Sequence, residues 1–352
     1  MIDAQIAKSF PAGAESRGFS LDLHLKTAAG VTVLFGPSGS GKTLTLDCIA
    51  GLMKPDGGRI TLGDRLVFDA ASGVNLPPQA RRTGYVFQNY ALFPHMTLRR
   101  NLDFASELLP QSERARRVNE MIERFHLSEV AGLRPYELSG GQKQRCSIAR
   151  ALVGEPLVLL LDEPARGLDA PLRAELYEVL RQVRAQFGTP VLLVTHDLDE
   201  CFELGDAMLV VREGRVVQEG SPRDVAGRPA NLEVARLLGI YNLLQAEVLA
   251  LDPGNNTSRV RFGEFELCGP YYSGKLVEDR VWLYVRPQDL MAVPRNGPPA
   301  PNQMPADLLR VVAKPGSTRL EFAGDIAVET RGFDQSVREW LIEFPVDSLR
   351  AL

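Results

Sequence analysis

The fold of this chain is decided by the stretch VTVLFGPSGSGKTLTLDCIA, residues 31–50. Its first five residues are apolar or β-branched, which is typical of a buried strand, and residues 43–52 have the composition of a helix. Residues 36–43 lie between them and match the pattern G-x-x-x-x-G-K-[ST] in the strand-to-helix context that this motif requires. The alternative is a glycine-rich turn with a chance lysine, but the strand, the spacing and the helix are all in place. We therefore predict a phosphate-binding loop.

The residues of this loop have the chemistry needed to bind a nucleoside triphosphate. Glycine allows backbone angles that other residues rarely adopt, so successive N–H groups can surround an anion, and the N-terminus of the following helix adds positive potential. We expect Lys42 to bind the β- and γ-phosphates and the Thr43 hydroxyl to ligate Mg²⁺. The predicted nucleotide-binding residues are Gly36, Pro37, Ser38, Gly39, Ser40, Gly41, Lys42 and Thr43.

A second apolar run, residues 157–161, ends in two carboxylates, Asp162 and Glu163. Ligand sites in parallel α/β sheets lie at the carboxyl ends of the strands. We predict that Asp162 holds the Mg²⁺ shell, directly or through a water, and that Glu163 is the general base that polarises the attacking water. Alone, this pattern is an ordinary strand end. The phosphate loop upstream in the same predicted sheet is what favours the catalytic interpretation.

In the rest of the chain, the residue pattern indicates three regions of different secondary structure. Residues 191–195 and 207–212 are further buried-strand candidates separated by helical stretches, which favours a parallel sheet covered on both faces. A charged, helical stretch lies between the phosphate loop and the acidic pair. From Gly239 onwards, short β-type runs alternate with turn residues, which indicates a small all-β region. We predict an ATP-binding domain over residues 1–236, a helical subdomain within it at about 90–155, and a β domain over 237–352.

Composition argues against several classes of protein. The 352 residues are 45% hydrophobic and 24% charged, as in ordinary globular proteins. The formal net charge is −4, whereas a dedicated nucleic-acid binder usually carries a basic excess. No run approaches the roughly 20 apolar residues of a membrane-spanning helix, and the first residues do not have the pattern of a signal peptide. The four cysteines form no C-x-x-C pair, which disfavours a zinc site or a disulfide framework and fits a reducing cytosol.

Residues 138–145, LSGGQKQR, carry a resemblance to a known family. They end the predicted helical stretch, and LSGGQ is the signature of the ATPase subunits of ABC transporters, which the chain resembles over about residues 1–235. Three other landmarks occur in the family's order, namely Gln88 of the Q-loop, residues 167–169 of the D-loop and the switch histidine His196. The resemblance implies an α/β P-loop ATPase domain with a helical insertion, followed by a small all-β, OB-like domain of the TOBE or MOP type.

The resemblance also implies roles for residues and partners. Two copies would pair head to tail, and each ATP would lie between the phosphate loop of one chain and the signature of the other. Gln88 would contact Mg²⁺ and the attacking water, and His196 would bind the γ-phosphate and hold Glu163 and the water in line. The implied catalytic residues are Glu163, His196 and Gln88, the implied metal ligands are Thr43, Gln88 and Asp162, and the signature residues that contact nucleotide are Ser139, Gly140, Gly141 and Gln142.

Two positions in the ATPase half concern the dimer contact and the binding of adenine. Similar importer subunits commonly have a small residue where Arg166 stands, and a long cation there could change contacts across the dimer. Many family members stack adenine on an aromatic side chain from an early strand. We favour Phe10 for this role over Phe19, with the equal alternative that both rings belong to the core or to a loop.

Residues 77–102 resemble importer subunits for oxyanions, ferric iron, sugars and polyamines, and the phosphate-loop region with its VFDAASGVNLPP insertion looks most like the molybdate importers. Residues 285–289, VRPQD, resemble the RPED-type strand end of the C-terminal barrels in such importers. The expected anion-binding segment matches poorly. Lys314, Ser317 and Thr318 could meet an anion, but a hairpin turn at residues 315–316 is the simpler interpretation.

We therefore expect the ATP-hydrolysing subunit of a bacterial importer, for molybdate, with ferric iron, sulfate, polyamine or sugar as alternatives. It would bind permease subunits through residues 88–101, work with a separate substrate-binding protein, and lie peripherally on the cytoplasmic face of the inner membrane, with no nucleic-acid partner. A chromosome or DNA-repair ATPase would need long coiled coils, for which the interval from Lys42 to Ser139 is too short. An export ATPase usually lacks the C-terminal barrel, and a translation-factor ATPase would carry two cassettes.

Overall fold

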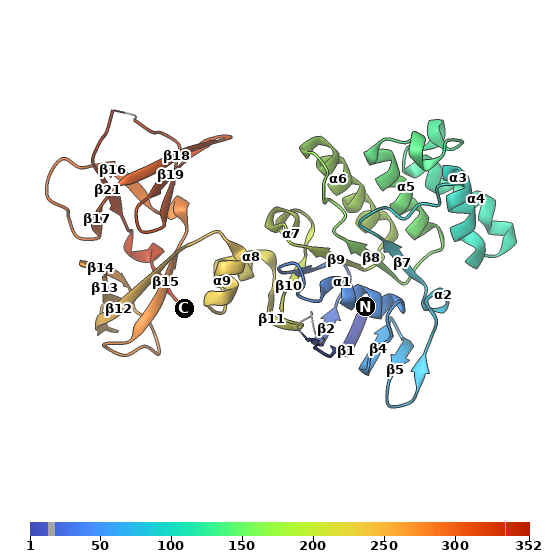
Figure 1. Ribbon diagram of the computed structural model, residues 1–352, viewed down its shortest axis with the longest axis horizontal. Coiled ribbons are helices and arrows are strands. Elements are labelled where there is room, and N and C mark those ends of the chain that lie inside the picture. Colours follow the sequence, from blue (N-terminus) through green and yellow to red (C-terminus); the bar gives the residue numbers. More distant parts are fainter. Residues whose placement is uncertain (13–17, 335) are drawn as a thin grey trace. The chain divides into compact units, whose positions relative to one another are not determined.

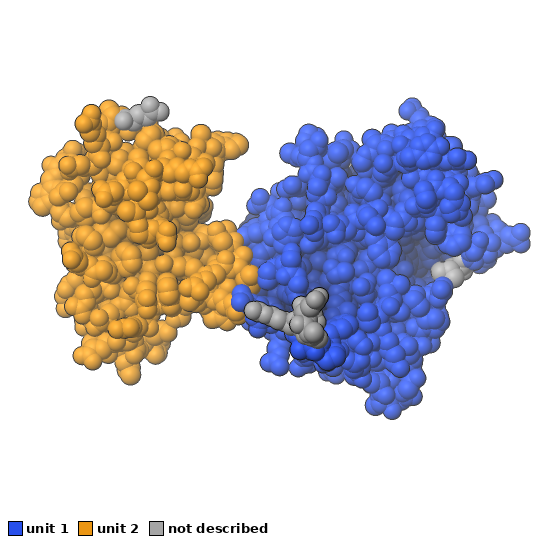
Figure 2. All heavy atoms as spheres, viewed as in Figure 1, with its two compact units in different colours: residues 1–228 blue, residues 229–352 orange. Residues whose placement is uncertain are grey.

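The computed structural model describes residues 1–12, 18–334 and 336–352. Its contacts divide the chain into two compact units, residues 1–228 and 229–352 (Figure 2). The sequence places the boundary at 236/237, which lies inside helix α9 (Leu232–Leu238) of the second unit.

A six-stranded sheet forms the framework of the first unit, with the order β11-β10-β3-β9-β8-β7 (Figure 1). All neighbouring strands run parallel except β11, which pairs antiparallel with β10. Every residue of β3, β8 and β9 is buried, as their continuous apolar sequences predict. The strands are β3 (Val31–Phe35), β7 (Thr83–Val86), β8 (Val158–Asp162), β9 (Val191–Thr195), β10 (Ala207–Arg212) and β11 (Arg215–Gly220).

A second, antiparallel sheet in this unit has the order β2-β1-β4-β5-β6. Burial alternates along β2, because one face of the sheet packs on the core and the other is open to solvent. Helix α1 (Lys42–Ala50) and both sheets contribute to one hydrophobic cluster, so the helix that follows the phosphate loop is held by apolar packing. The strands are β1 (Ile2–Phe10), β2 (Phe19–Thr27), β4 (Gly57–Leu62), β5 (Arg65–Asp69) and β6 (Val74–Asn75).

The predicted helical insertion is confirmed and follows β7 in the chain. Its main helices are amphipathic, with buried apolar positions such as Leu102, Met121 and Ile148. They are α3 (Leu98–Ala105), α4 (Gln111–Arg124) and α5 (Gly140–Val153), with short 3₁₀ turns at Ser106–Leu108, Ser128–Val130 and Pro135–Glu137. The remaining helices of the unit are α2 (Pro78–Arg81), α6 (Ala170–Phe187), α7 (Leu198–Leu204) and α8 (Pro222–Gly227).

After helix α9, the second unit consists of the expected small all-β region. Three sheets, with orders β14-β13-β12-β15-β22, β16-β21-β17 and β18-β19-β20, share one hydrophobic core that includes Leu283, Phe322 and Ile342. Its strands are β12 (Asn242–Asp252), β13 (Thr257–Phe262), β14 (Phe265–Pro270), β15 (Arg280–Val285), β16 (Met291–Pro294), β17 (Gln303–Ala306), β18 (Leu308–Lys314), β19 (Ser317–Phe322), β20 (Ile326–Thr330), β21 (Trp340–Glu343) and β22 (Arg350–Ala351), with 3₁₀ turns at Pro287–Asp289 and Val346–Ser348.

Candidate functional site

The register of the parallel sheet brings the predicted site residues to one edge. Phe35 at the end of β3 lies opposite Thr195 of β9, and Asp162 of β8 lies opposite Val194 of the same strand. The phosphate loop follows β3, His196 follows β9, and the acidic pair consists of the last residue of β8 and the residue after it. Because the strands run parallel, segments that are far apart in the chain lie together at one edge of the sheet, as in other open α/β sheets.

The phosphate loop joins β3 to α1 and depends on its glycines. Gly39 and Gly41 have φ values of 80° and 101°, in the left-handed region that residues with a Cβ rarely adopt. At Gly36 the constraint is space, because a Cβ there would collide with the carbonyl oxygen of Val211. The surroundings of Gly39 are open, since no atom lies within 4 Å of the position that its Cβ would take. The loop backbone is thus accessible to an anion.

Lys42 folds back over the loop. Its Nζ atom donates hydrogen bonds to the carbonyl oxygens of Gly36 and Pro37, both at 2.8 Å. Burial lowers the pKa of Lys42, and the nearby carboxylates of Glu163 and Asp162 oppose this effect. The ammonium group therefore sits where phosphate oxygens could replace the two carbonyl partners.

The two predicted oxygen ligands of Mg²⁺ from the loop and from β8 are in direct contact. The Thr43 hydroxyl donates a hydrogen bond to Oδ1 of Asp162 at 3.0 Å. Burial raises the pKa of Asp162, and the bond from Thr43 acts in the opposite direction. Within the described ranges, no group of three or more His, Cys, Asp or Glu side chains could hold a metal ion. A hydroxyl beside one carboxylate fits Mg²⁺, which is usually bound by few protein ligands together with substrate phosphates and water.

Glu163 occupies an unusual backbone position at the end of β8. Its φ is 45°, and its N–H donates to the carbonyl oxygen of Val194 at 3.0 Å. The side chain is only 12% exposed, and both carboxylate oxygens have a partner. Oε1 lies 3.3 Å from Nδ1 of His196, and Oε2 accepts a hydrogen bond from Nη1 of Arg166 at 2.8 Å. The structure thus brings together two of the three predicted catalytic residues.

The third predicted catalytic residue, Gln88, joins this cluster through Arg166. With the amide assigned so that its oxygen faces the guanidinium group, that oxygen accepts from Nε of Arg166 at 3.2 Å and from Nη1 at 3.3 Å. The role of Arg166 could not be foreseen from the motifs. The sequence signal for the contact is the spacing of three residues between Glu163 and Arg166, because a tight turn brings the first and fourth residues close together.

The signature segment forms the start of another helix. Ser139 caps α5, since its hydroxyl accepts from the N–H of Gln142 at 3.2 Å, and the Gln142 side chain accepts from the N–H of Ser139 at 2.9 Å. Gly141 lies close to α6, because a Cβ there would be 2.9 Å from a methyl group of Leu172. Among the residues that the structure describes, no hydrogen bond or ion pair joins residues 139–142 to the phosphate loop.

The two candidates for adenine stacking are paired across β1 and β2, in which Phe10 lies opposite Phe19. A Cβ at Gly41 would be 3.0 Å from the ring of Phe19, so this ring lies against the phosphate loop. Phe10 is 40% exposed, and its ring lies 5.6 Å from Nζ of Lys8. Of the two candidates, it is Phe19, the second, whose ring contacts the phosphate loop. The stacking role stays a prediction.

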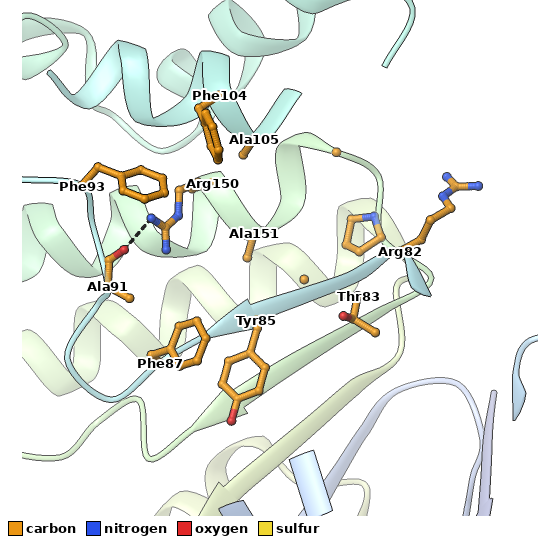
Figure 3. A pocket seen from close by; sticks show the side chains of 13 residues that line it. Arg82, Thr83, Tyr85, Phe87, Ala91, Phe93, Phe104, Ala105, Arg150 and Ala151 are labelled. Atoms are coloured by element: carbon orange, nitrogen blue, oxygen red, sulfur yellow. Dashed lines mark hydrogen bonds between the residues drawn. The ribbon is translucent and has the colours of Figure 1, made fainter. Parts of the chain in front are cut away.

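The expected contact segment for a permease borders a cavity of about 440 Å³ between β7 and the helical insertion (Figure 3). Arg150 of α5 anchors the loop here, donating to the carbonyl oxygen of Ala91 at 2.6 Å and lying 5.6 Å from the Phe93 ring. Phe93 and Phe104 meet edge to face, with ring centroids 5.0 Å apart. Phe104 is 48% exposed, and neither it nor Arg150 is distinguished by any family motif in the sequence.

The accessory domain shows no free cationic site at the segment considered for an anion. Lys314 and Ser317 face each other across the β18–β19 hairpin, with the turn at residues 315–316. Both side chains bind one carboxylate, since Glu329 accepts from Nζ of Lys314 at 3.4 Å and from Oγ of Ser317 at 2.6 Å. The hairpin interpretation is confirmed. No helix in the described part of the chain is long and apolar enough to span a membrane.

Comparison with known proteins identifies the family of this chain. Residues 20–166 match the family model described as ABC transporter. The chain is 38% identical over 316 residues to the molybdenum import ATP-binding protein ModC of Paramagnetospirillum magneticum, and the alignment covers 86% of each chain. This chain belongs to the ATP-binding subunits of ABC transporters. The expected ATPase activity and the α/β domain followed by a small all-β domain are thereby confirmed for this import ATPase.

Other relatives of this ABC ATPase differ in the cargo that their names state. The chain is 45% identical over 233 residues to the spermidine/putrescine import ATP-binding protein PotA of Nitratidesulfovibrio vulgaris, covering 66% of this chain and 61% of that one. It is 41% identical over 266 residues to the trehalose/maltose import ATP-binding protein MalK of Thermococcus litoralis, covering 73% and 70%. A dimeric ATP-binding cassette solved with ADP and Pi is 28% identical, with a TM-score of 0.53, and is matched over 99% of its length and 63% of this chain.

Proposed function

We propose that this ABC ATPase subunit hydrolyses ATP at the edge of the parallel sheet to energise molybdate import. The observation that carries the ATP chemistry is the meeting of Thr43 with Asp162 and of Glu163 with His196 at adjacent strand ends. Molybdate is supported by the molybdenum import relative, whose alignment extends through both units at 38% identity. Tungstate is expected as a second cargo, because the two tetrahedral dianions are nearly isosteric.

Each site residue has a distinct part in the proposed reaction. Lys42 exchanges its two carbonyl partners for the β- and γ-phosphate oxygens, and the glycine-rich backbone binds the phosphates through its N–H groups. Thr43 and Asp162 would hold Mg²⁺, which when bound neutralises the charge on the phosphates. Gln88 would contact this ion and the water. Glu163 accepts a hydrogen bond from the water that attacks the γ-phosphorus, while His196 holds the carboxylate and the γ-phosphate in line. The water oxygen bonds to the γ-phosphorus and gives a proton to Glu163, while the bond from that phosphorus to the β–γ bridging oxygen breaks, leaving ADP and phosphate.

The proposed working unit is a pair of chains. Ser139 and Gln142 cap their own helix, and in the described residues they have no hydrogen bond to the phosphate loop of the same chain. The cassette solved with ADP and Pi is dimeric, as its title states. Both observations support a nucleotide site completed by the signature segment of a second copy, including Gly140 and Gly141.

The proposed membrane partner is a permease helix in the 440 Å³ cavity beside β7. The cavity is lined by aromatic rings, including the exposed Phe104, and by the loop that follows Gln88 (Figure 3). Aromatic grooves of this kind suit an amphipathic helix. Binding there would place the subunit peripherally at the inner face of the membrane, where a separate binding protein delivers the cargo from the other side.

The cargo is tested by deleting the gene in a strain that depends on molybdoenzymes. At limiting molybdate we expect molybdenum uptake and molybdoenzyme activity to fall, to recover with the wild-type gene or with excess molybdate, and not to recover with Glu163→Gln. Polyamine import is the second candidate, because the spermidine/putrescine relative is 45% identical. Full molybdoenzyme activity at limiting molybdate, together with lost uptake of a polyamine, iron, sulfate or a sugar, would overturn the molybdate proposal.

A further inference from the structure

Arg166 links the two side chains that are proposed to contact the attacking water. Its Nη1 atom donates to Oε2 of Glu163 at 2.8 Å, and the same guanidinium group donates to the amide oxygen of Gln88 at 3.2 and 3.3 Å. Gln88 follows β7 and Glu163 follows β8, so one side chain bridges the ends of two neighbouring strands. The resemblance to the ABC transporter ATPases assigns no role to this cation.

The local backbone holds Arg166 in this place. The residue lies in the turn between β8 and α6, where its N–H donates to the carbonyl oxygen of Glu163 at 3.1 Å. The preceding residue, Ala165, is buried, and its carbonyl oxygen accepts from the N–H of Leu168 at 3.2 Å. The turn is thus fixed on both sides of Arg166, and the guanidinium group returns over the carboxylate three residues earlier.

The contact engages both side chains that are proposed to meet the attacking water. A carboxylate has two oxygens, and in Glu163 one lies against His196 and the other against Arg166. The amide oxygen of Gln88 is also directed at Arg166. A cavity of about 130 Å³, large enough for water, is lined by Glu163, Arg166 and His196, so a water in this cavity shares the carboxylate of Glu163 with Arg166.

We propose that Arg166 is a positioning residue that restrains hydrolysis by holding Glu163 and Gln88 together. Turnover is then faster once the guanidinium group releases Oε2 of Glu163, because the carboxylate can turn towards the water and no longer shares this oxygen with Arg166. The planar fork of arginine suits a bridge between a carboxylate and an amide, which the single ammonium of lysine reproduces poorly. The inference rests on the proposed role of Glu163 in polarising the water.

An ordinary surface ion pair of the same spacing exists in this chain and serves as a control. Arg181 of α6 bonds to Glu178, three residues earlier, at 3.0 Å and to Glu203 at 2.8 Å. Its side chain is 48% exposed, close to the 54% of Arg166, but its partners are exposed at 58% and 54%, against 12% for Glu163. Arg181→Ser therefore removes a similar cation without touching the site.

The test compares the ATPase kinetics of the purified full chain with those of Arg166→Ser, Arg166→Lys and Arg181→Ser. For Arg166→Ser we expect kcat to rise about fivefold, a factor equivalent to about 1 kcal/mol, at an unchanged KM for ATP. Arg166→Lys should lie between this variant and the wild type, because it keeps the charge and loses the fork. Arg181→Ser should match the wild type, and thermal melting verifies that each variant is folded.

An unchanged or lower kcat in Arg166→Ser, with the variant folded, overturns the inference. Glu163→Gln, measured alone and with Arg166→Ser, separates this failure from failure of the proposed function. If Glu163→Gln is inactive and Arg166→Ser is no faster than the wild type, only the restraint by Arg166 is wrong. If Glu163→Gln hydrolyses ATP at the wild-type rate, the role of Glu163 fails and the restraint fails with it.

Discussion

Glu163 combines a strained backbone, burial and two charged or polar neighbours in a single residue. A non-glycine residue with φ of 45° costs on the order of 1–3 kcal/mol, and such positions cluster at functional sites. Here the strained conformation directs the carboxylate from the end of β8 towards His196, which follows the adjacent strand β9. We interpret the strain as the consequence of placing an acid beside the phosphate loop.

Glu163→Gln is the residue-scale test of this interpretation. The amide keeps the shape of the side chain but cannot act as a base, so ATP hydrolysis should fall by roughly 10²–10⁴ while ATP binding is retained. Hydrolysis is measured by phosphate release and binding by equilibrium titration. Glu178→Gln, on the exposed face of α6, is the matched control and should behave as the wild type. Near-normal hydrolysis by Glu163→Gln would exclude it as the base.

At the scale of elements, helix α5 connects the signature to the loop after Gln88. The helix begins at the capping residue Ser139, and further along it Ser147 and Arg150 donate to the carbonyl oxygens of Tyr90 and Ala91 at 3.1 and 2.6 Å. Tyr90 and Ala91 have φ values of 63° and 47°, so this loop is held in an uncommon conformation by the helix. These hydrogen bonds connect the loop to the helix that begins at the signature, and the proposed coupling to a permease would use this contact.

Phe104→Asp tests the element that is proposed to bind the permease. Phe104 lines the cavity and is 48% exposed, so a charge there should leave the fold and the basal ATPase activity unchanged. We expect co-purification with the permease to be lost, because a carboxylate would have to be buried in an apolar contact. Phe202→Asp, at a 44% exposed position on α7, is the control. Normal assembly of the Phe104→Asp chain with its permease would contradict this assignment.

At the scale of the whole molecule, the proposed pairing of two chains assigns the signature and the phosphate loop of one nucleotide site to different copies. Gly140 has room for a side chain, since its Cβ would have no neighbour closer than 3.8 Å. A substitution there should therefore disturb what binds to the signature more than the fold of its own chain. Lys42, in contrast, bonds within its own phosphate loop.

Mixing a Lys42→Ala chain with a Gly140→Asp chain tests this cooperation. A mixed dimer contains one site with both defects and one site with none, so the mixture should regain ATP hydrolysis that neither variant shows alone. The measurement is phosphate release as a function of mixing ratio, with the two single variants as controls. If the mixture is no more active than the sum of its components, or wild-type activity stays strictly linear in chain concentration at high dilution, the shared site is wrong.

The sequence by itself determined the parts of this protein that depend on contiguous residues. Three short motifs show their chemistry through their spacing, namely the phosphate loop, the acidic pair after an apolar run and the signature at the start of a helix. The alternation of β-type runs and turn residues after Gly239 predicted the β-rich second unit. Only the tertiary structure showed the antiparallel sheet, because β1 pairs with strands that begin at residues 19 and 57. The bridge from Gln88 through Arg166 to Glu163 likewise required the order of the strands, since side chains after different strands meet only when the sheet sets their strand ends side by side.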